Sequence, residues 1–316
     1  MVVLVTGGAG FIGSNLCDKL LEQGEEVICV DNFNDYYNPE RKRENIKSAQ
    51  LNPNFKLYEA DIRDKNALDH VFKEDIEVVV HLAARAGVRP SIADPQLYED
   101  VNIRGTLNLL EQARINGVNQ FIFGSSSSVY GNAKNVPFSE DQDTSKPVSP
   151  YAATKKAGET LCHTHHHLYG INVTCLRFFT VYGPRGRPDM APYLFTDAIY
   201  KEQPLIMFGD GSARRDYTYI DDIISGILKS LETSLSFEII NLGNSNTVTL
   251  KEFISIIERV VGKDAIIKNA PDQAGDVQIT HADITKAREI LNWSPTTNVN
   301  QGMEMFFRWY ARLERV

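Results

Sequence analysis

The first 180 residues of this chain alternate short runs of β-branched and other apolar residues with longer stretches of helical periodicity. The runs predict strands at Val2–Thr6, Glu26–Asp31, Phe55–Ala60, Val78–Leu82, Gln120–Ser125 and Asn172–Phe178. The stretches between them predict helices near Ile12–Gln23, Lys65–Lys73, Tyr98–Asn116 and Tyr151–Leu168. Such alternation is typical of a mainly parallel sheet covered by helices on both faces. We therefore expect an α/β protein with a doubly wound parallel sheet of the Rossmann type.

The pattern loosens after Phe178. Residues 183–188 predict a loop and residues 209–211 a turn, because both stretches are rich in glycine and proline or aspartate. Later segments predict helices at Asp222–Glu232, Lys251–Val261 and Ile284–Asn292, and a strand at Glu238–Leu242. We expect a smaller substrate-binding domain interleaved with the larger one. The larger, dinucleotide-binding domain would comprise 1–178 with 212–242 returning to it, and the smaller one 179–211 and 243–316.

Three glycines, Gly7, Gly10 and Gly13, form a GxxGxxG pattern directly after the first predicted strand, and Phe11 and Ile12 then open a helix. Glycines here permit a tight turn and close approach of the backbone to a pyrophosphate, which a helix N-terminus attracts. Asp31 ends the second strand, where a carboxylate suits a ribose 2′-hydroxyl and repels a 2′-phosphate. The pattern predicts NAD rather than NADP. A glycine-rich turn that binds nothing is the alternative, and the combined strand, spacing and acid argue against it.

Two further segments lie where strands end. Asp61 and Ile62 follow the third predicted strand, and Leu82, Ala83 and Ala84 follow the fourth. Ligands of doubly wound sheets bind at the carboxyl ends of the strands. We expect both segments beside the adenine and nicotinamide portions of the cofactor, although without the glycine pattern both would be interpreted as structural.

A possible catalytic group is formed by Tyr151, Lys155 and Ser126. Tyr151 and Lys155 are four residues apart at the start of a predicted helix, so they share one face. A tyrosine is a poor base near neutral pH, but a neighbouring ammonium favours the phenolate and lowers its pKa. A serine hydroxyl can hydrogen-bond the reacting oxygen. Together they suit alcohol–ketone interconversion beside a nicotinamide, although Tyr-x-x-x-Lys also occurs by chance on helices.

Several segments together resemble the extended short-chain dehydrogenases/reductases, from Met1 almost to the C-terminus: residues 6–13, 125–131, 151–155 and 215–217. Within that group the chain is similar to UDP-glucuronate 4-epimerases, on the segments 31–37, 86–89, 180–190 and 217–222. The resemblance implies an isomerase that oxidises C4 of a UDP-sugar transiently, with NAD held tightly and regenerated in each turnover. It implies that Tyr151 takes the C4 hydroxyl proton, Lys155 also holds the nicotinamide ribose, and Asn32 and Phe178 join the cofactor-binding residues.

Sister reactions of the same group are distinguished at Ser127 and Ser128. Related 4,6-dehydratases carry an acid and a base directly after the catalytic Thr or Ser, and hydroxyls cannot do that proton work. Related UDP-glucuronate decarboxylases tend to have Glu where Ser128 stands. A 4-epimerase of UDP-glucose or UDP-N-acetylglucosamine remains an alternative, since it shares every catalytic residue. A redox-sensing binding protein without catalysis is a further alternative, but such proteins usually lose the tyrosine or the lysine.

The resemblance also suggests which residues bind the substrate. Arg187, with Thr180, would recognise a sugar carboxylate, because a guanidinium suits a planar carboxylate; an exposed loop arginine, or one paired with Asp189, is the alternative. Ser126, Ser127 and Ser128 would line the sugar pocket. Arg215 and Asp276 match positions that hold diphosphate and ribose, Arg89 would assist there, and Phe208 lies where the nucleobase packs. Many relatives have arginine where this chain has Gln273, so one phosphate contact is expected to differ.

Composition limits the remaining possibilities. The 316 residues carry a formal net charge of −8, which argues against non-specific binding of nucleic acid or a membrane surface. No apolar stretch long enough for a membrane span and no secretory signal is seen. Cys17, Cys29, Cys162 and Cys175 lack metal or disulfide spacing and suggest a reduced, cytoplasmic protein. We expect no metal at the histidines 163 and 165–167. The resemblance implies a homodimer formed through the helices near Tyr98–Asn116 and Tyr151–Leu168, and two-fold dimers are also the commonest soluble oligomers.

Overall fold

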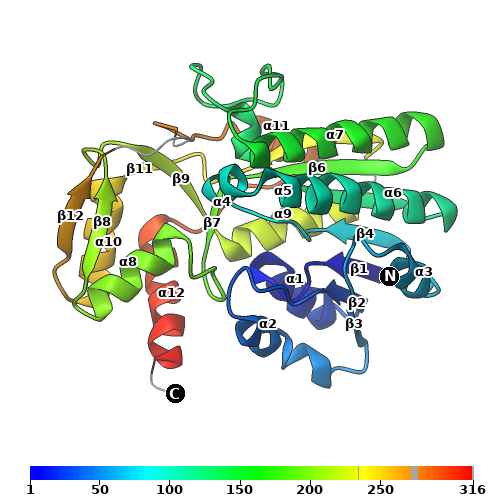
Figure 1. Ribbon diagram of the computed structural model, residues 1–316, viewed down its shortest axis with the longest axis horizontal. Helices are drawn as coiled ribbons and strands as arrows, with labels where there is room; N and C mark the ends of the chain where they lie inside the picture. The colour runs from blue at the N-terminus through cyan, green and yellow to red at the C-terminus, as the bar shows by residue number, and fades with distance from the viewer. Residues whose placement is uncertain (234, 272–276, 315–316) are drawn as a thin grey trace.

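A parallel sheet forms the centre of the larger part of the molecule (Figure 1). The computed structural model describes residues 1–233, 235–271 and 277–314. Within these residues the sheet has seven strands, in the order β10-β6-β5-β4-β1-β2-β3. Their bounds are β1 (Val2–Thr6), β2 (Glu26–Asp31), β3 (Phe55–Glu59), β4 (Val78–His81), β5 (Gln120–Ser126), β6 (Asn172–Phe178) and β10 (Phe237–Leu242). All neighbouring strands run parallel.

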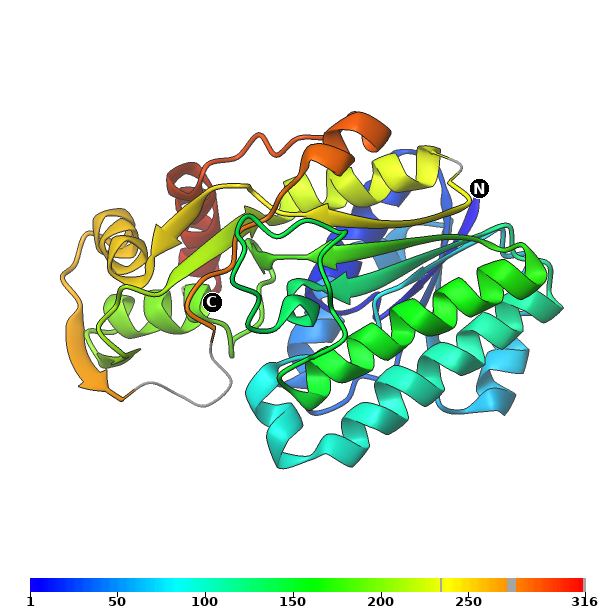
Figure 2. The same ribbon diagram turned by 90° about the horizontal axis from the view of Figure 1, so that it is seen from above.

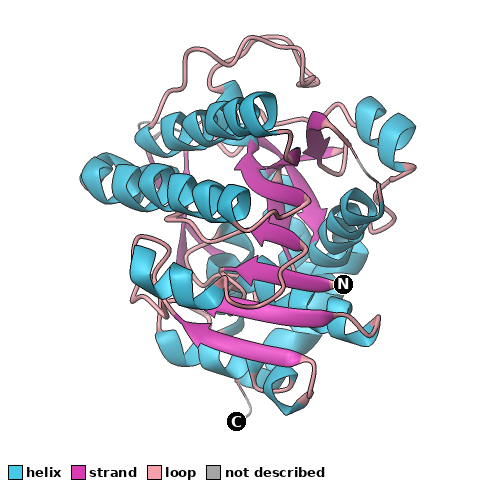
Figure 3. Cartoon of the chain, turned by 90° about the vertical axis from the view of Figure 1, so that its right-hand side faces the viewer, coloured by secondary structure: helices cyan, strands magenta, loops and turns pink. Residues whose placement is uncertain are grey.

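The side chains of each strand alternate between two hydrophobic clusters. In β1, Val3 and Val5 belong to one cluster and Leu4 to the other, as the period of a strand requires. The first cluster packs under α1 (Phe11–Glu22) and α9 (Ile220–Glu232), and the second under α3 (Lys65–Val71), α6 (Gly105–Ile115) and α7 (Pro150–Tyr169). Figure 3 shows the strands between the two helical layers. The predicted doubly wound α/β fold is confirmed.

The helix predicted at Tyr98–Asn116 is interrupted. It begins at Pro95 as α5 (Pro95–Glu99), passes through a π-helical turn (Asp100–Arg104), and continues as α6. In the π turn the Asn102 side chain accepts a hydrogen bond from Arg85 N (2.8 Å) and donates one to Thr154 Oγ1 (3.0 Å). The helical periodicity of the sequence does not predict the π turn. The turn inserts one residue into the helix and leaves the spacing of the apolar residues nearly unchanged.

Several shorter elements were not predicted. On the larger part these are α2 (Pro39–Ile46), the 3₁₀ turn Ala49–Leu51, α4 (Val88–Ala93) and the 3₁₀ turn Ser127–Tyr130. The start of α2 did have a sequence indication. Asn38 caps it by accepting from Glu40 N at 3.0 Å, and Pro39 occupies the first helical position.

The smaller part, at the left of Figure 1, contains two small sheets and three helices among the described residues. The sheets are β11-β9-β7 and β12-β8, with bounds β7 (Thr180–Tyr182), β8 (Pro204–Phe208), β9 (Arg214–Tyr219), β11 (Thr247–Thr249) and β12 (Ile266–Ala270). The helices are α8 (Ala191–Tyr200), α10 (Leu250–Val261) and α12 (Val299–Leu313), and α11 (Thr285–Leu291) packs on β10 and α9 instead. Of these elements, the sequence predicted α10 and α11, at Lys251–Val261 and Ile284–Asn292, and missed the others.

The chain passes between the two parts more than once. Of the segment 212–242, expected to return to the large sheet, β10 joins that sheet, whereas β9 pairs with β7 and β11. The division of the chain into 1–178 with 212–242, and 179–211 with 243–316, remains a proposal. No helix among the described residues is long and apolar enough to cross a membrane.

Candidate active site

A cavity of about 430 Å³ lies at the carboxyl ends of the strands, beside the point between β1 and β4 where the strand order reverses. This is where ligands bind in doubly wound sheets. Every residue predicted for catalysis or cofactor binding lines it: Gly7, Gly10, Phe11, Ile12, Gly13, Asp31, Asn32, Asp61, Ile62, Leu82, Ala83, Ala84, Ser126, Tyr151, Lys155 and Phe178. The structure therefore brings together residues that are up to 171 positions apart, from 7 to 178.

The glycine loop follows β1 and leads into α1. Gly7 has a φ of +69°, and a Cβ there would lie 2.8 Å from the backbone nitrogen of Ala83. A Cβ on Gly13 would clash with the carbonyl oxygen of Gly7. The first turn of α1 contains no acidic side chain. The loop thus needs glycine for its own packing, and the uncovered helix N-terminus beside it favours a phosphate.

Asp31 is almost fully buried at the end of β2. Its carboxylate accepts hydrogen bonds from the backbone nitrogens of Ala9 (3.2 Å) and Phe33 (2.9 Å). It also pairs with the ammonium of Lys42, at 3.6 Å, and burial lowers the pKa of Lys42. Lys42 comes from α2 and lines the same cavity, although no motif in the sequence indicated it. The side of the cavity expected to meet the cofactor ribose therefore carries a buried ion pair.

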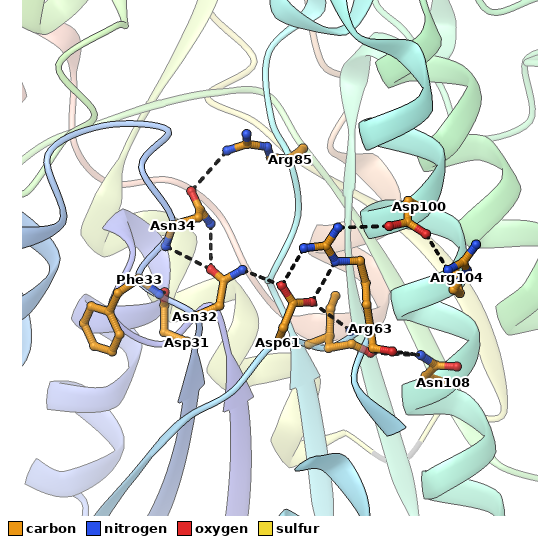
Figure 4. A network of polar contacts seen from close by, with 11 residues as sticks. Asp31, Asn32, Phe33, Asn34, Asp61, Arg63, Arg85, Asp100, Arg104 and Asn108 are labelled. Carbon is orange, nitrogen blue, oxygen red and sulfur yellow. Dashed lines mark hydrogen bonds and ion pairs between the residues drawn. The ribbon is translucent and has the colours of Figure 1, made fainter. Parts of the chain in front are cut away.

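Asp61 lies at the centre of a polar network beside the cavity (Figure 4). Arg63 donates to both of its oxygens (Nε–Oδ1 2.9 Å, Nη2–Oδ2 2.8 Å), and Asn32 donates to Oδ2 at 2.8 Å. Burial disfavours the charged form, but these hydrogen bonds outweigh it and lower the pKa of Asp61 to about 2. Arg63 is held in turn by Asp100 of the π turn, at 2.9 Å. Asp61 is thereby fixed as an oriented, ionised acceptor.

Tyr151 and Lys155 lie on the first turns of α7, and the structure places both at the cavity. Ser149 caps the helix by accepting from Ala152 N at 3.1 Å, and Pro150 occupies its first position. The Lys155 ammonium donates a 2.6 Å hydrogen bond to the carbonyl oxygen of Gly124 in β5, and burial lowers its pKa to about 8. Lys155 is therefore held on the strand that ends in Ser126.

The environment of the Tyr151 phenol differs from the expected one. Burial raises its pKa, and the groups that oppose this rise are the Ser126 hydroxyl and the Arg187 guanidinium. Lys155 was expected to do so. Ser126 Oγ itself accepts hydrogen bonds from Ser128 N (3.2 Å) and Ser128 Oγ (2.8 Å). The 3₁₀ turn after β5 thus orients the Ser126 hydroxyl that acts on the phenol.

The predicted substrate residues are split between two places. Ser126, Ser127, Ser128, Thr180 and Arg187 line the cavity. Arg89, Phe208 and Arg215 do not appear in its lining. The Arg89 guanidinium lies over the Phe208 ring at 5.1 Å, and Arg215 Nη1 donates to Arg214 O at 2.9 Å. Asp276 and Gln273 lie outside the described residues.

The sequence allowed Arg187 either to bind the substrate or to pair with Asp189, and its position in the structure is compatible with both. It lines the cavity, and it also pairs with Asp189 through Nε (2.9 Å) and Nη2 (2.6 Å). Tyr36 and Tyr37, which lie in the segment 31–37, also line the cavity, although no role was predicted for them. The resemblance of the segment 31–37 was the indication that could have identified them.

Clusters outside the cavity are structural in character. His165 contacts Leu161 O (2.9 Å) and Glu111 Oε1 (3.0 Å), and the rings of His163 and His167 stack. In the described part of the chain, no group of three or more His, Cys, Asp or Glu residues could hold a metal ion. Cys17, Cys29, Cys162 and Cys175 are buried and free of disulfide bonds.

Comparison with known proteins gives consistent results. Residues 4–306 match the family model of GDP-mannose 4,6-dehydratase. The chain is 46% identical over 308 residues to the UDP-glucuronate 4-epimerase of Thermodesulfobacterium geofontis, covering 97% of this chain and 95% of the relative. It is similar to the crystal structure of UDP-glucuronic acid 4-epimerase from Bacillus cereus in complex with UDP-glucuronic acid and NAD, with 41% identity, a TM-score of 0.94, and coverage of 99% and 100%. It is also similar to the UDP-glucose 4-epimerase of Thermotoga maritima, with 34% identity, a TM-score of 0.92, and coverage of 99% and 100%.

Proposed function

This chain belongs to the extended short-chain dehydrogenases/reductases, in the family described by the GDP-mannose 4,6-dehydratase model, and we propose that it is an NAD-dependent UDP-glucuronate 4-epimerase. It would interconvert UDP-glucuronate and UDP-galacturonate through a transient 4-keto sugar. The observation that carries the proposal is one cavity that contains the glycine loop, Ser126, Tyr151, Lys155 and Arg187 together.

The residues around the cavity fit NAD. The glycine loop leaves space at the N-terminus of α1 for the pyrophosphate, and Asp31 is placed to accept from a ribose hydroxyl. Asn32, Asp61 and Ile62 would surround the adenine end, and Leu82, Ala83, Ala84 and Phe178 the nicotinamide end. When bound, NAD would supply the hydride acceptor and donor for C4 of the sugar.

The protein's own contribution to the reaction would be proton transfer and positioning. Tyr151 would take the proton from the C4 hydroxyl and return it to the C4 oxygen. Ser126 would donate to that oxygen, since its own acceptor capacity is used by Ser128. Lys155, fixed on Gly124 O, would hold the ribose of the cofactor and supply a positive charge beside the reacting groups.

The preference for an acidic sugar rests on the other wall of the cavity. Arg187 and Thr180 would bind the carboxylate, assisted by the hydroxyls of Ser127 and Ser128. A 4-keto hexuronate is a β-keto acid that can lose carbon dioxide, so a firm hold on the carboxylate favours epimerisation. The family model is named after a dehydratase, but Ser127 and Ser128 cannot act as the acid and base that dehydration needs. A neutral-sugar 4-epimerase remains the second candidate, since the Thermotoga maritima relative is one.

The nucleotide would extend from the cavity toward the smaller part of the molecule. Arg215, Asp276 and Arg89 are proposed for the diphosphate and ribose, and Phe208 for the uracil. The stacking of Arg89 over Phe208 at 5.1 Å supports this, because a cation and a ring already lie side by side there.

We further propose a cytoplasmic homodimer. The helices α6 and α7 lie side by side on one face of the sheet (Figure 2). Their surface carries the exposed apolar side chains Leu107, Ile115, Leu168 and Tyr169. A second copy could cover them in a symmetric four-helix arrangement. The four buried cysteines without disulfide bonds support the cytoplasmic location.

The purified protein should be incubated with UDP-glucuronate and, separately, UDP-glucose, without added NAD, and the sugar followed by proton NMR. Formation of UDP-galacturonate with little action on UDP-glucose is the expected result. Turnover of UDP-glucose alone would contradict the acid specificity and leave the Tyr151 chemistry intact. A UDP-pentose with release of carbon dioxide would identify a decarboxylase instead.

A further inference from the structure

Tyr36, in the loop after β2, has two guanidinium groups close to its ring. The Arg187 guanidinium lies 5.3 Å from the centre of its ring and the Arg85 guanidinium 5.4 Å. Its hydroxyl donates to Asp189 Oδ2 at 3.2 Å. Arg85 is tied back by a 3.2 Å hydrogen bond from Nη1 to Asn34 Oδ1 (Figure 4). The ring therefore contacts Arg187 directly, and its hydroxyl contacts the carboxylate that Arg187 pairs with.

Asp189 uses only one side of the Arg187 guanidinium. Its two oxygens accept from Nε (2.9 Å) and Nη2 (2.6 Å), a two-pronged arrangement that fixes the plane of the group. Within the described residues, Arg187 Nη1 forms no hydrogen bond. Arg187 and Tyr36 line the cavity, whereas Asp189 is not part of its lining as far as the structure describes the chain. Asp189 thus lies behind the guanidinium, and the Nη1 edge is left for a ligand.

The backbone that carries Arg187 is also fixed. Gly186 N donates to Gly183 O at 3.0 Å, and Met190 N donates to Arg187 O at 3.2 Å, so two successive turns set the loop. Arg185, two residues earlier, pairs with Asp18 of α1 at 2.7 Å. The Arg187 side chain is only 19% exposed. A long side chain held at both ends in this way loses little freedom when a ligand binds.

We propose that Tyr36 and Asp189 are positioning residues, which hold the Arg187 guanidinium with its Nη1 edge toward the sugar and so make the site selective for a carboxylate. This rests on the proposed function, since it assigns the specificity of that same site. Neither residue touches the reacting atoms.

The charges around Tyr36 support this arrangement. Arg85, Arg187 and Asp189 together carry one net positive charge, which one substrate carboxylate would neutralise. Arg187 and Tyr36 stabilise the ionised form of Asp189 and lower its pKa, although burial opposes them. A neutral sugar would leave the Nη1 donors partly desolvated and unpaired, which costs free energy. Selectivity would thus arise from the orientation of the donors in addition to the net charge.

The test compares kcat/KM for UDP-glucuronate and UDP-glucose in the wild type and in Asp189→Asn, Tyr36→Phe and Tyr36→Leu. Asp189→Asn should lower the acid-to-neutral ratio about tenfold through a higher KM for UDP-glucuronate, because a charged two-pronged pair is lost. Tyr36→Phe keeps the ring and should cause a smaller loss, and Tyr36→Leu a larger one. The kcat/KM for UDP-glucose should fall less than that for UDP-glucuronate, since UDP-glucose has no carboxylate for the Nη1 edge to bind, and any effect of a displaced Arg187 on the Tyr151 phenol acts on both substrates alike.

A matched control is Glu59→Gln, which removes the carboxylate of another two-pronged pair, with Arg43, outside the cavity. It should leave the ratio unchanged. An unchanged ratio in Asp189→Asn and in both Tyr36 variants would overturn the inference. So would an equal loss on both substrates in variants whose circular dichroism and thermal unfolding match the wild type, because that indicates a general structural role. A wild type that does not act on UDP-glucuronate overturns the proposed function itself, and is recognised before any variant is measured.

Discussion

Arg177 of β6 and Glu159 of α7 form a two-pronged ion pair that is almost completely buried beneath the cavity, with Nε–Oε1 at 2.8 Å and Nη2–Oε2 at 2.9 Å. Ser125 Oγ also donates to Glu159, at 2.7 Å. Glu159 lies four residues after Lys155 on the same face of α7, so the pair docks the helix that carries Tyr151 and Lys155 onto the strand that ends in Ser126.

Glu159→Gln should therefore lower the free energy of unfolding by about 3–5 kcal/mol, because it leaves the Arg177 guanidinium buried without a charged partner. Replacing both members, as Arg177→Met with Glu159→Leu, should cost less than the single change. Urea denaturation measures both values. A double variant less stable than Glu159→Gln would contradict the assignment of the loss to an unpaired charge.

Tyr151→Phe should lower kcat for UDP-glucuronate at least about a hundredfold, since the phenol is the proposed proton carrier. Binding of UDP-glucuronate, measured by calorimetry, should change by less than about threefold, because only the hydroxyl is removed. Tyr200→Phe, in α8 and outside the cavity, is the control and should leave kcat unchanged. A Tyr151→Phe variant with near-normal kcat would exclude Tyr151 as the acid–base group.

Gly13→Ala should abolish retention of the cofactor and destabilise the fold by about 1–3 kcal/mol, because the new Cβ meets the carbonyl oxygen of Gly7 in a fixed loop. Gly24→Ala is the control. Its φ of +81° makes alanine unfavourable by about 1 kcal/mol, but nothing lies within 4 Å of the added Cβ. Absorbance of the purified variants and analysis of the released nucleotide give the cofactor content. Full cofactor content in Gly13→Ala would show that the loop can shift.

Asp31→Ser should raise the affinity for NADP relative to NAD by about tenfold, because it removes the carboxylate and leaves the Lys42 ammonium to attract a 2′-phosphate. Calorimetric titration of the stripped protein with each nucleotide measures the ratio. Adding Lys42→Met to Asp31→Ser should cancel the gain. A gain that survives the second substitution would point to another cation.

Stability should fall as the pH is lowered below about 6.5, the ordinary pKa of histidine, partly because of His81. His81 is buried between Thr6 and Thr106, and burial lowers its pKa to about 3. Between these two pH values the unfolded chain binds a proton at this residue and the folded protein does not. The free energy of unfolding therefore loses up to about 1.4 kcal/mol per pH unit from this group.

The comparison of wild type with His81→Asn isolates that contribution. Urea denaturation at pH 7, 6 and 5 should show a shallower decline in His81→Asn, whose amide does not titrate. Equal declines in the two proteins would mean that His81 is protonated in the folded state.

The sequence determined the large sheet and its helices with errors of one or two residues at most ends, because a period of two or 3.6 and the glycine loop are local properties. It failed at the π turn around Asn102 and at the strands β7, β8 and β9, where tertiary contacts decide the backbone. It also missed the helix start at Asn38–Pro39, although the capping side chain and the proline are local signals. The same division holds for the site. Gly7, Asp31, Ser126, Tyr151 and Lys155 could be chosen from motifs on single elements.

The tertiary structure alone decided which partners these residues meet. Lys42 reaches Asp31 from a different element, Lys155 is held by Gly124, and Arg187 is oriented by Asp189 and by Tyr36, 151 positions away in the chain. The sequence determines the chemical type of each side chain. Its charge state and direction depend on burial and on neighbours brought together by strand order, because electrostatic and hydrogen-bond energies depend on distance in space and not on separation along the chain.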